Sequence, residues 1–183
     1  MEGIIALLDR AHSQQVKDLW LELEQHFGLR GVLAFPYPHV SFQLSDGYSF
    51  TTIQERLRDT VARFRPIQVH TTGLGLFIQP APVLYVPVVR STALERIHRL
   101  LWKAFPPLQG DGGYYAHNQW MPHITLAVGD LKAEMLPGVI ELLSTRDFHW
   151  EITLDNLTFA QQIPGGLSIQ KSWQLEGKNL TKF

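Results

Sequence analysis

A four-residue pattern of histidine, an aliphatic residue, a hydroxyl residue and an apolar residue occurs twice in the chain, each time directly after a proline. The copies are PHVSF at residues 38–42 and PHITL at residues 122–126. Alternation of polar and apolar residues is typical of a β-strand with one buried face, because successive side chains of a strand point to opposite sides. The pattern therefore predicts two strands that each anchor one row of side chains in a core.

The opposite row of each strand carries polar side chains. On the first strand it consists of His39, Ser41 and Gln43, and on the second of His123 and Thr125. The apolar row that should face the core consists of Val40, Phe42, Leu44, Ile124, Leu126 and Val128. Two such strands facing each other would form a pocket with two imidazoles and two hydroxyl groups.

Strands and helices are expected to alternate along the chain. Besides the histidine strands, apolar runs bounded by turn residues predict strands at 4–8, 67–78, 83–89, 148–161 and 167–175. Apolar residues at helical spacing predict helices at 11–27, about 51–64, 92–105 and 137–143. The order β-α-β-α-β thus occurs twice, with a histidine strand third in each series.

This repeated order predicts an α+β fold with two lobes related by a pseudo-two-fold axis. Each lobe is expected to be an antiparallel sheet with helices packed on its outside, and a central cleft should separate the lobes. We expect residues 1–183 to form one domain, with lobe-like halves at approximately 1–80 and 81–183. The two histidine strands would then face the same cleft.

Local signals refine the expected elements. Gly28 is a stop for the first helix, and capping-box spacing places the start of the second near Thr51 or Thr52 and the start of the third at Thr92. Pro87 favours an edge position for its strand. The sequence PGG at 164–166 predicts the turn of the last hairpin, and GDGG at 110–113 predicts a flexible flap.

Composition excludes several classes of function. The formal net charge of -1 and the pI near 6.7 give no basic surplus, so tight binding along a nucleic-acid duplex is not expected. The absence of cysteine excludes disulfides, thiolate zinc sites and cysteine nucleophiles. The first residues form neither a basic leader nor a signal sequence, and no apolar run is long enough to cross a membrane. We therefore expect a cytoplasmic monomer.

Two histidines on facing strands suit a reaction that takes up one proton and releases another. With an unperturbed pKa of about 6.5, a neutral imidazole can act as a general base and a protonated one as a general acid. Attack on a phosphodiester needs both. The hydroxyls of Ser41 and Thr125 could hold the non-bridging phosphate oxygens, where negative charge develops in the transition state.

The chain resembles the 2H phosphoesterase family, also called 2′-5′ RNA ligase-like or cyclic phosphodiesterase-like proteins. Both signature tetrads are present, at residues 39–42 and 123–126, and they lie 123 − 39 = 84 positions apart. Serine replaces threonine in the first tetrad and keeps the hydroxyl donor. The resemblance covers most of the chain and extends to the duplicated α+β order.

The resemblance implies metal-independent chemistry, without a cofactor, on 2′,3′-cyclic phosphates or 2′-5′ linkages of RNA ends or small nucleotides. It implies that His39 and His123 are the catalytic acid and base and that Ser41 and Thr125 hold the phosphate. It does not indicate which histidine is the base. Ligation by the same residues is equally compatible with it, because the phosphodiester exchange is reversible.

Aromatic residues near the tetrads are further candidates for substrate contact. Phe77, Tyr115 and Trp120 could flank a nucleotide or stack on its base, or could instead pack the surrounding chain. The sequence HTT at 70–72 also has a hydroxyl two residues after a histidine, but it lacks the proline and the aliphatic residue, so we interpret it as structural.

Two other functions share some of these residue requirements. A metal-dependent hydrolase is disfavoured, because there is no His-Glu-x-x-His motif and the strand histidines lack an obvious carboxylate third ligand. A non-catalytic module that binds a nucleotide or RNA in the same cleft stays open, because binding and catalysis require similar donors.

Overall fold

The computed structural model describes residues 2–177 except 46, 48–49, 79, 106–112 and 165. The order of the elements is β1 (Glu2–Leu7), α1 (Arg10–Phe27), η1 (Gly31–Ala34), β2 (His39–Ser45), α2 (Phe50–Val61), β3 (Ile67–His70), β4 (Gly75–Phe77), β5 (Val83–Pro87), α3 (Thr92–Ala104), β6 (His123–Ala127), η2 (Ala133–Met135), α4 (Leu136–Leu143), β7 (Glu151–Leu154), β8 (Asn156–Ile163) and β9 (Gly166–Gln174). Both histidine patterns begin a strand, as predicted. The flap at 110–113 falls mainly outside the described residues. The turn predicted at 164–166 joins β8 to β9, where Ile163 pairs with Gly166, and only Gly165 of this turn lies outside the described residues.

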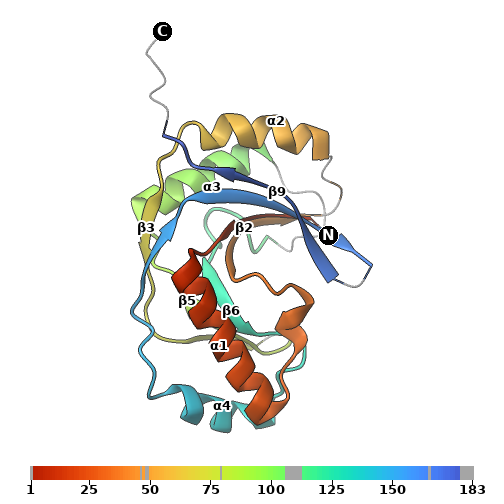
Figure 1. Cartoon of the computed structure of the whole chain (residues 1–183), viewed down its shortest axis with the longest axis vertical. Coiled ribbons are helices and arrows are strands. Elements are labelled where there is room, and N and C mark those ends of the chain that lie inside the picture. Colours follow the sequence, from red (N-terminus) through yellow and green to blue (C-terminus); the bar gives the residue numbers. More distant parts are fainter. Residues whose placement is uncertain are drawn as a thin grey trace.

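The strands form antiparallel sheets in two layers of the molecule (Figure 1). One sheet has the order β2-β1-β8-β9, and α2 and α3 lie beside it. The other has the order β4-β5-β6, with α1 beside it, and the pair β3-β7 joins it through a bridge between Thr71 and Val88. The mixed architecture of antiparallel sheets and helices confirms the predicted α+β class.

The two sheets do not follow the expected division near residue 80. The C-terminal strand β8 pairs with β1, and β4 from the first half pairs with β5 from the second. Helices also cross over, because α1 contacts β6 and α3 contacts β2. The physical reason is that an antiparallel sheet accepts any strand that covers an open edge, whatever its position in the chain. Each layer is therefore built from both halves.

Helix α1 shows how the sequence specifies its own boundaries. The Asp9 carboxylate caps the helix by accepting a hydrogen bond from the backbone N–H of His12 at 3.0 Å. Gly28 ends it with φ 71°, a left-handed conformation that costs glycine little, as predicted. The buried stripe between these ends consists of Val16, Leu19, Trp20 and Leu23.

Other local expectations need correction. The strand predicted at 67–78 is divided into β3 and β4, with Gly73 at φ 69° between them, a left-handed conformation that interrupts the extended backbone. The strand β5 is central and not at an edge; Pro87 is its last residue, where a missing N–H is tolerated. Ser91, not Thr92, caps α3 by accepting a hydrogen bond from the N–H of Leu94 at 3.2 Å. Helix α2 begins at Phe50, before either threonine proposed as its cap.

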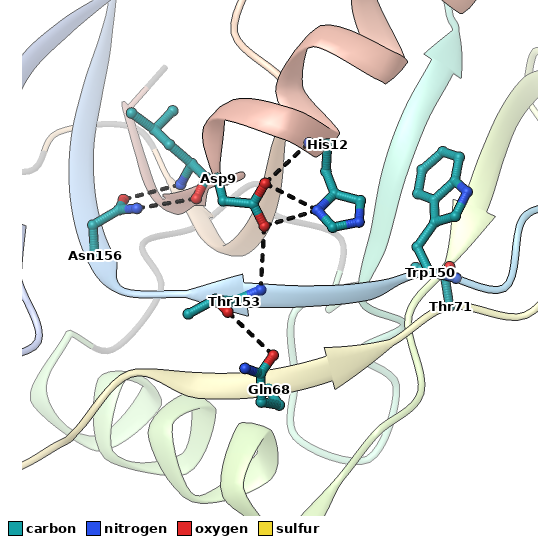
Figure 2. A network of polar contacts seen from close by, with 8 residues as sticks. Asp9, His12, Gln68, Thr71, Trp150, Thr153 and Asn156 are labelled. Carbon is teal, nitrogen blue, oxygen red and sulfur yellow. Dashed lines mark hydrogen bonds and ion pairs between the residues drawn. The ribbon is translucent and has the colours of Figure 1, made fainter.

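A polar network joins the start of α1 to both layers (Figure 2). Asp9 accepts hydrogen bonds from the His12 ring, through Nδ1 at 2.8 Å, and from the backbone of Thr153 in β7 at 3.3 Å. Asn156 in β8 bonds both backbone groups of Leu7 at 3.0 Å. Desolvation opposes ionisation of Asp9, but the bonds from His12 outweigh it and lower the pKa of the carboxyl. The network fixes where β1 ends and α1 begins.

Candidate functional site

The two motif strands lie at the edges of their sheets and contact each other. Strand β2 ends the four-stranded sheet and β6 ends the three-stranded one. Their aliphatic and apolar motif residues are buried in the main core, namely Val40, Phe42, Ile124 and Leu126. The four polar motif residues, His39, Ser41, His123 and Thr125, are half-buried on the opposite side. This confirms the alternation predicted for both tetrapeptides.

Each motif strand contains a bulge at the last position of its tetrapeptide. On β2, Ile4 and Ile5 pair with Gln43 and Ser41, so Phe42 is the extra residue. On β6, Leu84 and Tyr85 of the neighbouring strand pair with Ala127 and Thr125, so Leu126 is the extra one. A bulge interrupts the alternation of faces and re-aims the side chains beside it.

The bulge in β2 overturns one prediction. Gln43 was expected on the face of His39 and Ser41, but its side chain is fully buried and donates a hydrogen bond to the backbone carbonyl of Phe105. The physical reason is that the extra residue shifts the alternation by one. Gln43 consequently turns toward the core together with Phe42, and the polar row of the first strand ends at Ser41.

Both motif histidines are held in one tautomer by the same local geometry. Nδ1 of His39 lies 2.6 Å from the carbonyl oxygen of Tyr37, and Nδ1 of His123 lies 2.7 Å from that of Met121. A carbonyl can only accept, so Nδ1 carries the proton and a neutral ring keeps its lone pair on Nε2. The proline between each pair favours extended backbone at the residue before it, which places the carbonyl under the ring. Both rings can therefore use Nε2 for chemistry.

Burial shifts the pKa of both imidazoles downward. Desolvation lowers the pKa of His39 to about 4, although the bond to Tyr37 acts in the opposite direction, and the charge of His123 lowers it further. Desolvation also lowers the pKa of His123 against the opposing effect of the Met121 carbonyl. Both rings are therefore neutral at pH 7 in the free protein.

Aromatic rings surround each motif histidine. Phe35 packs edge-on against His39 with ring centres 5.0 Å apart, and Phe77 packs edge-on against His123 at 5.3 Å. Tyr85 stacks on Phe77 at 4.3 Å and lies 5.0 Å from His123. Sequence reasoning named Phe77 but missed Phe35 and Tyr85. Their positions in the sequence could have indicated both residues, because Phe35 lies four residues before His39 and Tyr85 lies on the strand that pairs with the second motif.

Trp120 packs the surrounding chain, which is one of the two roles expected for it. Its ring is 1% exposed and stacks on Phe42 and on His98, with ring centres at 5.5 and 4.0 Å. A ring buried to this extent is not available to stack on a base, so the other role, contact with a substrate, does not fit the structure. Tyr115 is partly buried against the main core, and its carbonyl accepts a hydrogen bond from Nε2 of His98 at 3.0 Å.

The segment that leads into the first motif is docked on the end of the second motif strand. The backbone N–H groups of Arg30 and Gly31 donate to the Asp130 carboxylate at 2.6 and 2.7 Å. A Cβ at Gly31 would lie 1.9 Å from the carbonyl oxygen of Val128, so only glycine allows this approach. These contacts hold the segment just before the first motif against the end of the strand that carries the second motif.

In the sequence HTT at 70–72, His70 and Thr72 are both exposed, and the side chain with structural contacts is that of Thr71 between them. Thr71 is buried, donates to the carbonyl of Phe148 at 2.5 Å and accepts from the N–H of Trp150 at 2.9 Å. Among the described residues, no three histidine or acidic side chains cluster in a way that could hold a metal ion. Within the same part of the chain, no helix combines the length and apolar character of a membrane span.

Comparison with known proteins gives a consistent result. A protein of Geobacillus kaustophilus that is named as a phosphoesterase is 25% identical over 135 residues, which is 70% of this chain and 72% of that protein. The fold matches TT0787 of Thermus thermophilus with a TM-score of 0.70 at 15% identity, over 97% of this chain and 99% of that one. It matches LigT of E. coli in complex with 3′-AMP with a TM-score of 0.62 at 16% identity, over 96% of each chain. Residues 8–165 match the family model of the 2′-5′ RNA ligase superfamily, so the chain belongs to this family of 2H phosphoesterases.

Proposed function

We propose that this protein is a phosphodiesterase that opens 2′,3′-cyclic phosphates or cleaves 2′-5′ phosphodiester linkages at RNA ends or in small nucleotides. The observation that carries the proposal is the matched tautomer of the two motif histidines. Each ring donates through Nδ1 to the carbonyl two residues earlier and keeps Nε2 for the substrate. A base and an acid are then available from side chains alone, and the reaction needs no bound cofactor.

In the proposed reaction, His39 is the base and His123 the acid. Nε2 of His39 takes a proton from water as the water oxygen attacks phosphorus, and Nε2 of His123 gives a proton to the departing ribose oxygen. The strongly lowered pKa of His39 keeps it neutral at pH 7, as a base must be. The bound phosphodiester anion would favour the charged form of His123 and so supply the proton. Ser41 and Thr125 would donate to the non-bridging oxygens.

The relatives support a nucleotide as the substrate. LigT of E. coli has been solved with 3′-AMP, with ATP and with NADP+, all of which carry a phosphorylated ribose. The fold of this chain matches all three complexes over most of its length. In 2′-5′ ligation a 5′-hydroxyl takes the place of water: it gives its proton to the base as it attacks the phosphorus of a 2′,3′-cyclic phosphate, and the departing 3′ oxygen takes a proton from the acid. We therefore include 2′-5′ ligation of RNA ends in the proposal.

Turnover of two substrates tests the proposal. The wild-type protein should hydrolyse 2′,3′-cyclic AMP and a 2′-5′-linked diadenylate, with a bell-shaped pH profile, and should keep its activity in EDTA. Product formation is followed by chromatography, with a 3′-5′-linked diadenylate as the control substrate. Activity lost in EDTA and restored by zinc would instead indicate a metal-dependent hydrolase. Binding of both substrates without turnover would indicate a non-catalytic nucleotide-binding module.

Anion binding should be accompanied by proton uptake. His39 is neutral in the free protein at pH 6, because burial lowers its pKa to about 4, and burial also lowers the pKa of His123 below the ordinary 6.5. A bound dianion raises these pKa values, so about one proton should be taken up, and affinity should fall as pH rises through the raised pKa. Sulfate is a suitable probe, because it does not titrate near pH 6. Calorimetry in two buffers of different ionisation enthalpy measures the uptake, and proton release or none would contradict it.

A further inference from the structure

Two tryptophans hold the backbone at the hydroxyl residue of each motif. We propose that Trp120 and Trp20 are positioning residues, which aim the hydroxyls of Ser41 and Thr125 at the phosphate by bonding the carbonyls of these same two residues. The inference deepens the proposed function and rests on it. Neither tryptophan touches the reacting atoms in this proposal, and both act through the motif strands.

Trp120 fixes Ser41. Its indole Nε1 donates to the carbonyl oxygen of Ser41 at 2.9 Å. The ring stacks on Phe42 and on His98, nearly parallel to His98 at 6°. A side chain that is 1% exposed and stacked on two aromatic rings has little freedom, so the indole N–H is a rigid anchor.

Trp20 fixes Thr125 in the same way. Its indole Nε1 donates to the carbonyl oxygen of Thr125 at 3.0 Å, and the ring is 4% exposed. Trp20 lies on α1, which packs against β6, so the anchor comes from a helix of the first half of the chain. The two bonds therefore have the same donor, the same type of acceptor and the same motif position.

These carbonyls need a donor for a physical reason. Both belong to edge strands, and each lies directly before the bulged residue of its strand. A buried carbonyl without a partner costs free energy, and a bulge leaves the local backbone free to rotate unless something fixes it. Because a carbonyl and the side chain beside it share one Cα, fixing the carbonyl also restricts the direction of the Cα–Cβ bond that carries the hydroxyl.

Each tryptophan precedes one motif in the chain but bonds to the strand of the other motif, and these two connections set the spacing of the site. Trp120 lies three residues before His123 but bonds to β2, so a single indole connects the backbone of one motif to that of the other. Trp20 precedes the first motif but bonds to β6. An error of about 1 Å in the position of a catalytic group can reduce a rate by about 10²-fold. Loss of either bond should therefore affect turnover more than folding.

Conservative substitutions test the proposal. Trp120→Phe and Trp20→Phe keep an aromatic ring and remove the N–H. Each should lower kcat/KM for 2′,3′-cyclic AMP by about tenfold, the size of one buried hydrogen bond, and should weaken sulfate binding in parallel. The matched control is Trp150→Phe, which removes an indole bond of 2.9 Å to the Asp147 carbonyl, before β7. This control should leave kcat/KM and sulfate affinity within twofold of the wild type.

Double-mutant cycles separate positioning from general destabilisation. Trp120→Phe should lose most of its effect on sulfate affinity when Ser41→Ala is already present, and Trp20→Phe should do so with Thr125→Ala. The crossed pair Trp20→Phe with Ser41→Ala should be closer to additive. Additive effects in both matched pairs, or Phe variants with normal kcat/KM and sulfate affinity, would overturn the inference.

The experiment also distinguishes a variant that folds poorly from a failure of the proposed function. If a Phe variant melts well below the wild type, β-(3-benzothienyl)alanine at that single position replaces the N–H by sulfur and keeps the shape of the indole. If the wild type binds sulfate but turns over no substrate, the proposed function is wrong, and the cycles on sulfate affinity still decide the positioning role. If turnover is normal in the wild type and in both tryptophan variants, only the positioning role is wrong.

Discussion

Replacing His39 or His123 with alanine is expected to lower kcat for 2′,3′-cyclic AMP by about 10²- to 10⁴-fold, the contribution of one general acid or base. Both side chains are half-buried on the side of the strand away from the main core, so their removal should leave the fold intact. Steady-state kinetics and circular dichroism measure the two effects. The matched control is His149→Ala, an exposed histidine paired with Asp147, which should keep normal turnover.

The same variants should reveal which histidine is the acid. A p-nitrophenyl phosphodiester has a leaving group that departs without protonation, so it should restore much of the rate to the variant that lacks the acid and not to the one that lacks the base. We expect His123→Ala to be rescued and His39→Ala to stay slow, because burial lowers the pKa of His39 to about 4 and so keeps its ring neutral and able to accept a proton at pH 7. Rescue of His39→Ala alone would reverse the assignment. Near-normal turnover of cyclic AMP in either variant would refute the two-histidine mechanism.

Removing either motif hydroxyl is expected to have the second largest effect. Ser41→Ala and Thr125→Ala should each lower kcat by about 10²- to 10³-fold, the loss seen when one preorganised donor to a developing negative charge is removed. The loss should appear mainly in kcat, because the bond to the phosphate strengthens in the transition state. Single-turnover kinetics with 2′,3′-cyclic AMP measures the chemical step directly.

Conservative exchange provides the control for the hydroxyl variants. Ser41→Thr and Thr125→Ser keep the donor at the same position and should retain most of the activity. Thr153→Ala removes an exposed hydroxyl that bonds Gln68 in another part of the fold and should be neutral for turnover. If both alanine variants stay within threefold of the wild type, the hydroxyls do not hold the phosphate. If Ser41→Thr is as slow as Ser41→Ala, the donor is not what matters at this position.

The sequence by itself determined the local structure of the motifs. Val40 and Ile124 alternate with polar neighbours. This alternation predicted two half-buried strands, because successive side chains of a strand point to opposite faces. Gly28 ended α1 for a reason that is equally local, since its left-handed conformation is cheap only for glycine. The histidines and hydroxyls were therefore found on the correct face without a structure.

Only the tertiary structure decided how these segments meet. Gln43 turned inward because a bulge forms where β2 pairs with β1. The residue types of β2 do not predict this bulge. Trp120 became an internal anchor instead of a substrate contact because α3 and β2 enclose it. Tyr85 reached His123 through the register of β5 and β6. Strand pairing joins strand edges that are far apart in the chain, whereas a sequence pattern reflects only residues that are close together in the chain. Packing therefore determined which strands form each sheet and which residues surround each histidine.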